Sequence, residues 1–169
     1  MRFLKLIVIS FAVLFFAAVT FSFLFPSTLI VSRAININAS KTTVINLIKD
    51  WKGWSNWMEG MSDSSVHILS PVEARLGNTT VHIIQVDTVS VHSLWKSNQG
   101  KMMQSDITLY GTDSALTVVH WQFVQKIKWY PWEKLASLLS DKILGPMMEK
   151  DLNALKQKAE HTGISIISN

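Results

Sequence analysis

The sequence predicts an α+β domain in which one curved antiparallel sheet wraps around a long C-terminal helix, preceded by one transmembrane helix. Three observations predict this architecture. Residues 1–32 carry only two charged side chains and hold seven of the eight phenylalanines. A stretch rich in valine, isoleucine and threonine follows and is interrupted by glycine turns, as in a meander of strands. The C-terminal part has the apolar periodicity of a helix.

The composition narrows the class of protein. The chain has 169 residues, is 48% hydrophobic and 17% charged, and contains no cysteine, which excludes a disordered chain and a disulfide scaffold. Its net charge of +4 includes Arg2 and Lys5 at the N-terminus, so the rest of the chain offers no basic face for nucleic acid. We therefore predict no nucleic-acid partner. Residues 33–169 are long enough to form one domain with its own core.

Residues 6–25 predict a membrane span. No charged residue occurs between Leu6 and Ser32, and about 20 mainly apolar residues are what a helix needs to cross a bilayer. A cleaved signal peptide is the alternative, but its apolar region is shorter, typically about 7 to 15 residues. We expect residues 1–32 to be an uncleaved anchor, with the lipid bilayer as a partner, and residues 33–169 to be the attached domain.

The charges that flank the apolar run are nearly balanced, with Arg2 and Lys5 before it and Arg33 and Lys41 after it. A short N-terminal tail favours a cytoplasmic N-terminus. The predicted location is therefore the cell membrane, single-pass, with the domain outside the cytoplasm and, in a Gram-negative cell, in the periplasm. The absence of cysteine agrees with an exported domain whose core needs no disulfide.

After the anchor, residues 29–38 alternate between apolar and polar side chains, which predicts a half-buried strand, although Arg33 breaks the apolar phase. Ser40 is a suitable cap for the helix that follows. Apolar side chains recur along that helix at i, i+3, i+4 and i+7 up to Trp51, so one of its faces is apolar. We expect Gly53 to end this helix.

The next segment has the pattern of an antiparallel meander. Strands are predicted at 64–70, 79–86, 89–96, 101–110 and 114–126, with turns at Gly77-Asn78, Asn98-Gln99-Gly100 and Gly111-Thr112-Asp113. The boundary at Asp87-Thr88 is left open, because residues 79–96 could also form one long strand.

Residues 132–160 have helical periodicity. Gly145-Pro146 lies in the middle of this stretch and predicts a kink or a break, because proline removes a backbone hydrogen bond. In the second half Met148, Leu152, Leu155 and Ala159 recur at steps of four, three and four. This stripe is expected to face the sheet.

The order of elements is the helix-grip arrangement, and the motifs along it resemble the START-like, Bet v 1-like (SRPBCC) superfamily. Within it, the chain is most similar to bacterial proteins described as polyketide cyclase/dehydrase-like that carry an N-terminal membrane helix. The resemblance covers nearly the whole chain. It rests on Pro26-Ser27, on RAININA at 33–39, DWKGWSNW at 50–57, WYPWE at 129–133 and GPMME at 145–149, and on Leu152 and Leu155-Lys156.

The resemblance implies a cavity between sheet and helix that binds a hydrophobic small molecule or lipid, and only some members of the superfamily are enzymes. One departure concerns the strands. Trp95-Lys96-Ser97 leads through Gly100 almost directly into the final hairpin, which predicts a sheet one strand short of the full set.

The candidate ligand-binding residues are large apolar side chains, which suit a lipid or polyketide chain. They are Trp57, Trp95 and Trp121, with Met148, Leu152 and Leu155 on the helix side. Ordinary core packing is the alternative role for each of them. The leading hypothesis is a membrane-anchored, non-enzymatic START-like domain. A third hypothesis is an envelope interaction module whose pocket is filled by its own side chains.

The second hypothesis is a cyclase or dehydratase acting on an apolar substrate, with an inward Asp106 or His120 as general acid or base. No metal and no cofactor are predicted, because the spacing of the histidines matches no zinc motif. Only His82 and His92 could face each other, across a hairpin centred on Asp87, and one pair is a poor metal site.

Overall fold

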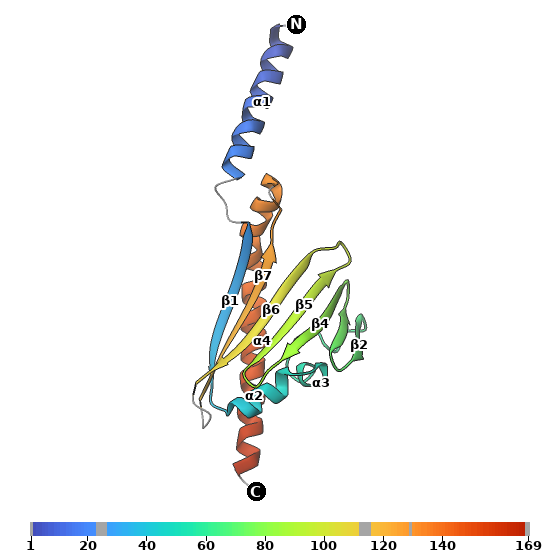
Figure 1. Cartoon of the computed structure of the whole chain (residues 1–169), viewed down its shortest axis with the longest axis vertical. Helices are drawn as coiled ribbons and strands as arrows, with labels where there is room; N and C mark the ends of the chain where they lie inside the picture. The colour runs from blue at the N-terminus through green and yellow to red at the C-terminus, as the bar shows by residue number, and fades with distance from the viewer. Residues whose placement is uncertain (1, 23–26, 112–115, 129, 168–169) are drawn as a thin grey trace.

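The computed structural model describes residues 2–22, 27–111, 116–128 and 130–167, and it confirms the α+β helix-grip fold (Figure 1). Thr112 and Asp113 of the last predicted turn, Pro26 and Trp129 lie outside the described residues. The chain runs in the order α1 (Arg2–Ser22), β1 (Thr28–Ile37), α2 (Lys41–Ile48), α3 (Trp51–Trp54), β2 (Val66–Ser70), β3 (Glu73–Leu76), β4 (Thr79–Val86), β5 (Ser90–Ser97), β6 (Met102–Tyr110), β7 (Thr117–Lys126) and α4 (Pro131–Ile167).

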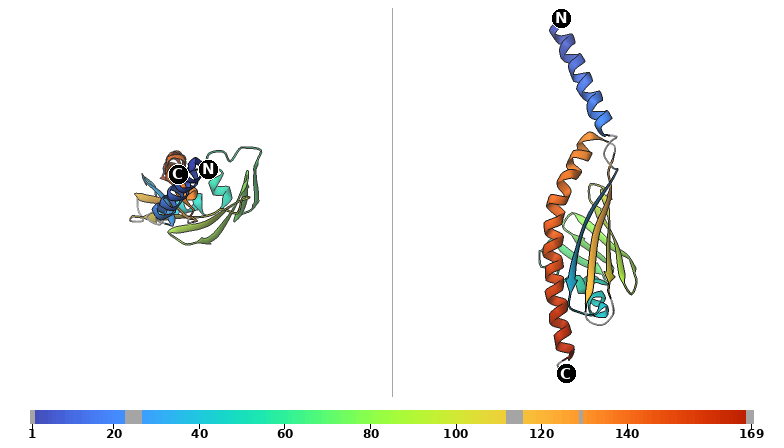
Figure 2. Two further views of the ribbon diagram at one scale, coloured as in Figure 1. Left: turned by 90° about the horizontal axis from the view of Figure 1, so that it is seen from above. Right: turned by 90° about the vertical axis from the view of Figure 1, so that its left-hand side faces the viewer.

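One seven-stranded antiparallel sheet forms the body of the domain, in the order β1-β7-β6-β5-β4-β3-β2. The first strand pairs with the last along its whole length, from Thr28 opposite Lys126 to Ile37 opposite Thr117. Helix α4 lies on one face of this sheet, and α2 and α3 cover its lower end (Figures 1 and 2). The core therefore lies between the sheet and α4.

Helix α1 extends away from the domain (Figure 2). Its apolar side chains are exposed, with Phe3 83% and Phe11 73% accessible. The segment Phe3–Thr20 is long and apolar enough to cross a membrane. Most described side chains of α1 are therefore exposed, and it contacts α4, whereas α2 and α4 carry core residues.

Strand β3 is absent from the sequence-based prediction. It is only four residues long, and the turn at Pro71 separates it from β2. Ala74, in its middle, is completely buried, while the neighbouring Arg75 is exposed. The sheet therefore has one strand more than the ranges predicted, because a strand this short gives little periodicity to detect.

Two helix boundaries also differ from the prediction. The helix after Ser40 ends at Ile48, and Asp50 then caps the separate α3 by accepting a 2.7 Å hydrogen bond from the backbone of Gly53. Gly53 lies inside α3 and does not end a helix. At the other end of the chain, α4 continues to Ile167, beyond the predicted end at residue 160. It contains Pro146 without a break, so of the predicted kink or break only the kink stays a prediction.

Candidate functional site

The candidate site is the inner face of the sheet, which is the face that α4 covers. Alternation along the strands decides which side chains point there. Ile107 in β6 and Trp121 in β7 are each 1% exposed, so the odd-numbered positions of these strands point inward. In β5 the inward positions are those of Val91, Ser93 and Trp95.

An aromatic cluster extends along this face from the end nearest α2 and α3. Trp54 is at its centre, with ring centroids 5.2 Å from Trp51, 5.1 Å from Trp57, 5.9 Å from Trp121 and 6.4 Å from Trp95. Phe123 extends the cluster, at 5.3 Å from both Trp95 and Trp121. Several of these pairs meet edge to face, a geometry that aromatic rings favour.

Two indoles of this cluster donate hydrogen bonds to serines of the inner face. Trp121 donates to Ser105 Oγ at 2.8 Å, and Trp95 donates to Ser93 Oγ at 3.0 Å. Among the described residues, Trp51 Nε1 is the buried side-chain nitrogen left without a hydrogen-bond partner. A buried N–H group without a partner costs about 1–3 kcal/mol of stability.

The structure brings the six predicted ligand-binding residues to one interior. Met148 and Leu152 are 1% exposed and Leu155 is fully buried, and together they form the inward stripe of α4. Trp57 and Trp121 are buried on the other side, and Trp95 is half-buried. Their part in ligand binding stays a prediction, because the same packing also builds the core.

Burial changes along the inner face. At the α2 and α3 end, Trp54 and Trp121 are 1% exposed. Toward the end of β7 that lies near α1, the inward side chains of Trp95, Met103 and Gln125 are all partly exposed. An apolar ligand would therefore find accessible inner surface at the end of the domain near α1.

Asp106 and His120 do not point into this interior. Both lie at even-numbered positions of β6 and β7, between inward residues, and so on the outer face of the sheet. The register places Asp106 opposite Gln122, and His120 opposite Thr108, so the two do not meet. The inward orientation required by the enzyme hypothesis is wrong for both residues.

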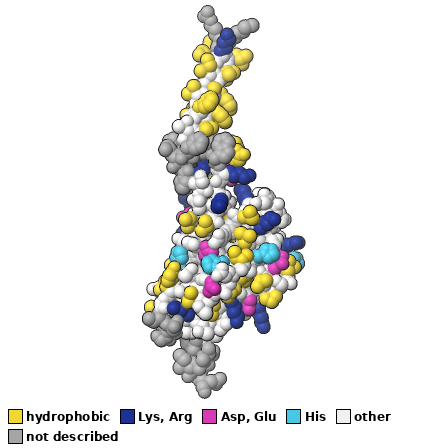
Figure 3. Space-filling view, in the orientation of Figure 1, with side chains coloured by type: hydrophobic (Ala, Val, Ile, Leu, Met, Phe, Trp, Pro, Cys, Tyr) yellow, Lys and Arg dark blue, Asp and Glu magenta, His cyan; other side chains and the backbone are white. Residues whose placement is uncertain are grey.

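On the outer face, Asp106 is the centre of a polar cluster that the sequence prediction missed. Its carboxylate accepts hydrogen bonds from His92 Nδ1 at 2.7 Å, Gln104 Nε2 at 3.1 Å and Gln122 Nε2 at 3.2 Å. Figure 3 shows histidine and acidic side chains across this face. Burial raises the pKa of Asp106, but the hydrogen bonds from these three side chains outweigh it, and the net pKa lies below the usual value.

The same cluster continues from His92 to Ser90, with Nε2 and Oγ 3.3 Å apart. A carboxylate, an imidazole and a hydroxyl in this order form the catalytic triad that activates a serine nucleophile. Here, however, the Ser90 hydroxyl donates to Asp87 Oδ2 at 3.1 Å, so its proton is already engaged. The arrangement ties β5, β6 and β7 together on the outer face.

The possible pairing of His82 with His92 is also wrong. Val86 pairs with Val91, so the β4–β5 turn is centred between Thr88 and Val89 and not on Asp87, which places His92 opposite Gln85. Beyond a bulge between Ile83 and Gln85, His82 lies opposite Leu94. His82 lies 3.5 Å from Glu73 instead. Among the described residues no group of three or more potential ligands is placed to hold a metal ion.

The inner face thus offers surface for binding and few groups for proton transfer. On β5, β6 and β7 the described inward positions hold serine, threonine, glutamine, apolar and aromatic side chains. General acid–base catalysis needs a titratable group within hydrogen-bond reach of the substrate. The chemistry of these three strands favours the recognition of an apolar molecule.

No family model and no curated protein matches the chain. Solved structures do. A START superfamily protein from Mycobacterium smegmatis is similar at a TM-score of 0.60 with 15% identity, over 79% of this chain and 99% of the other. A solution structure from Thermobifida fusca is similar at 0.59 with 15% identity, over 78% and 93%.

The di-domain aromatase/cyclase StfQ of the steffimycin biosynthetic pathway is similar at a TM-score of 0.57 with 9% identity, over 79% of this chain and 52% of StfQ. This chain therefore corresponds to about half of that protein. At such identities the likeness concerns the fold. Sheet topology, long helix and structural neighbours agree that the chain has the START-like helix-grip fold.

Proposed function

We propose that this protein is a membrane-anchored START-like domain that binds a hydrophobic small molecule or lipid between the sheet and α4. The observation that carries the proposal is the inner face itself. Indole rings and the α4 stripe of Met148, Leu152 and Leu155 form its walls, and the inward positions of β5 to β7 carry no titratable group. Such a surface suits an apolar ligand.

Two further observations support this function. The partly exposed inward side chains lie near α1, so a ligand would enter from the side of the bilayer. Structural neighbours include a START superfamily protein and the di-domain aromatase/cyclases StfQ and BexL. These proteins share the fold with this chain. We infer that α1 anchors the domain, with the N-terminus in the cytoplasm and the domain outside it.

The test uses the full-length protein in a nonionic detergent and native mass spectrometry to weigh any copurifying molecule. Met103 points inward, whereas Ile84 of β4 is 59% exposed and serves as the apolar control. We expect a bound apolar mass that Trp95→Ala and Met103→Gln reduce and Ile84→Gln leaves unchanged.

An empty spectrum, together with no uptake of a lipophilic dye, would contradict the proposal. It would favour the filled-core interaction module, for which the close ring contacts around Trp54 are the specific argument. Equal loss of ligand in the Ile84 and Met103 variants would show that the bound mass is not held by the inner face.

A further inference from the structure

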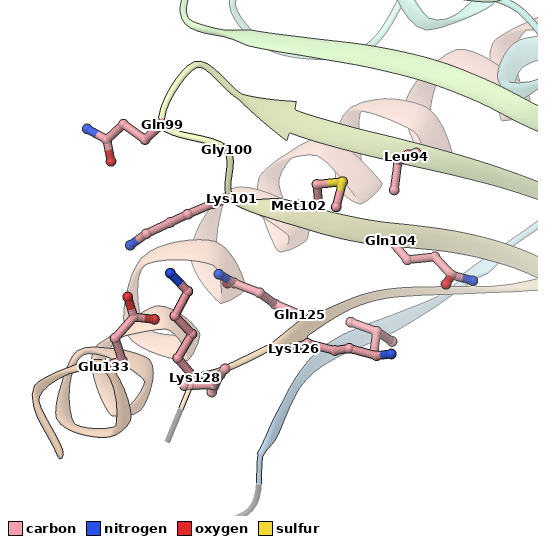
Figure 4. Close-up of a pocket in the computed structure, with 12 residues that line it drawn as sticks. Leu94, Gln99, Gly100, Lys101, Met102, Gln104, Gln125, Lys126, Lys128 and Glu133 are labelled. Carbon is pink, nitrogen blue, oxygen red and sulfur yellow. The ribbon is translucent and has the colours of Figure 1, made fainter. Parts of the chain in front are cut away.

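A hollow of about 620 Å³ lies outside the core, at the end of the domain next to α1. The pairing of β6 with β7 stops at Met103 and Gln125, and beyond this pair the two segments separate. The tip of the β5–β6 hairpin at 99–101, the end of β7 at 125–128 and Glu133 of α4 surround the opening (Figure 4). This hollow is called the rim site below.

The rim site has the two chemical parts of an amphiphile's binding site. Its walls include three lysines, Lys101, Lys126 and Lys128, against one acidic residue, Glu133. Figure 4 shows Lys101 and Lys128 on opposite sides of the opening, one from the hairpin and one from the segment after β7. Its floor is apolar. That part consists of Leu94, Met102, Val124 and Ile127.

The three lysines of the rim site carry more charge than the single Glu133 carboxylate can balance. Among the described residues, no ion pair or side-chain hydrogen bond involves Lys101, Lys126 or Lys128, and all three are exposed. Other lysines of the domain do have partners, such as Lys150 with Glu59 and Lys156 with Glu160. The excess positive charge is thus available to an anion from outside the chain.

The position of the rim site indicates where that anion comes from. The backbone N–H of Ile127 donates to Ser27 O at 2.9 Å, and α1 ends at Ser22. Five residues of chain reach at most about 18 Å, so the rim site lies within reach of the surface of any bilayer that α1 spans. Tyr130 and the 62% exposed Trp132 stack beside it at 5.0 Å, and these two residue types prefer the interface between membrane and water.

We propose that the rim site binds the headgroup of an anionic phospholipid, with the phosphodiester between Lys101 and Lys128 and the upper part of the lipid on the apolar floor. This inference rests on the membrane attachment in the proposed function and is independent of a ligand on the inner face. It gives the domain a fixed contact with anionic lipid, which would orient the partly exposed end of the inner face toward the bilayer.

The test measures the preference of the full-length protein, in nonionic detergent, for phosphatidylglycerol over phosphatidylcholine of equal chain length, by native mass spectrometry. Each lysine at an anionic surface contributes a factor of about five, so the Lys101→Gln/Lys128→Gln variant is expected to lower the preference about 25-fold. The control is Lys52→Gln/Lys158→Gln, which removes two exposed lysines from the far end of the domain and should leave the preference unchanged.

Rising salt should weaken the preference of the unmodified protein, a measurement that needs no variant. The proposal is overturned by an unmodified protein without a preference, by equal losses in both double variants, or by full displacement of the lipid by excess inorganic phosphate. Flotation of all variants with pure phosphatidylcholine vesicles tests the anchor separately. The copurifying apolar mass tests the inner face separately.

Discussion

Arg33 Nε donates a 2.7 Å hydrogen bond to Glu149 Oε1 and so links the first strand to the long helix across 116 positions of the sequence. Arg33 Nη1 also lies 3.1 Å from Oδ1 of Asp141, which precedes Glu149 on α4. Both hydrogen bonds raise the pKa of the Arg33 guanidinium. Arg33 interrupts the apolar alternation of β1. It points inward, and its guanidinium pairs with two acidic side chains of α4.

Gly145 leaves room for this guanidinium. A Cβ atom at position 145 would lie 2.0 Å from Arg33 Nη2, so Gly145→Ala must displace the arginine from Glu149 and Asp141. In the Arg33→Ala background the same substitution has free space and should gain up to about 1 kcal/mol of helix propensity. We expect Gly145→Ala to raise the melting temperature only when Arg33 is absent. An equal gain in both backgrounds, in a double-mutant cycle, would contradict the contact.

Gly53→Ala is expected to destabilise the domain. The added Cβ would lie 2.6 Å from the backbone oxygen of Leu47, which cannot turn away as a flexible side chain can. Overpacking of this kind costs about 1–3 kcal/mol, and helix propensity returns up to about 1 kcal/mol. We predict a net loss of about 1–2 kcal/mol in urea unfolding. Lys52→Ala, an exposed neighbour in α3, is the control and should have little effect.

Asp106→Asn tests the outer polar cluster through its pH dependence. The folded-state pKa of Asp106 lies below its usual value, so the carboxylate stabilises the fold above the unfolded pKa of about 3.9. That contribution disappears as the pH falls through the lower, folded-state pKa. We expect the variant to lose about 2 kcal/mol at pH 7 and the two proteins to converge in acid. A pH-independent difference would rule out the charge as the cause.

Asp151→Asn should raise the stability of the domain at neutral pH, whereas Asp106→Asn lowers it. Asp151 is 5% exposed on α4 and accepts a 2.9 Å hydrogen bond from the backbone of Glu59. Burial raises the pKa of Asp151, and the nearby Glu59 charge raises it further. The hydrogen bond from the Glu59 backbone and the Lys150 charge lower this pKa, but the net shift is upward. Ionised Asp151 therefore costs stability once the pH rises through its folded-state pKa.

An asparagine keeps the accepting oxygen without the charge. We expect Asp151→Asn to gain about 1 kcal/mol at pH 7, and less near pH 4, in thermal melts across the pH range. Asp151→Leu, which removes the acceptor as well, should destabilise the domain at both pH values. A gain from Asp151→Asn that is larger in acid than at neutral pH would refute this explanation.

The sequence by itself determined the features that depend on local periodicity. An uncharged run of about 20 residues is long enough for a bilayer, and α1 has that length. Apolar periodicity also predicts which side of each element is buried. This holds for the alternation around Ile107 and Trp121 and for the stripe of Met148, Leu152 and Leu155. The order of these elements was sufficient to predict the helix-grip fold.

The tertiary structure decided which distant residues meet. Asp106 lies between Ser105 and Ile107, all three buried, so the local pattern did not reveal that its side chain points outward to His92. The β4–β5 turn is centred between Thr88 and Val89 and not on Asp87, and this position separated His82 from His92. The rim site combines the β5–β6 hairpin, the end of β7 and the start of α4. Such sites depend on strand register and on where paired strands separate, and these result from packing across the whole sheet.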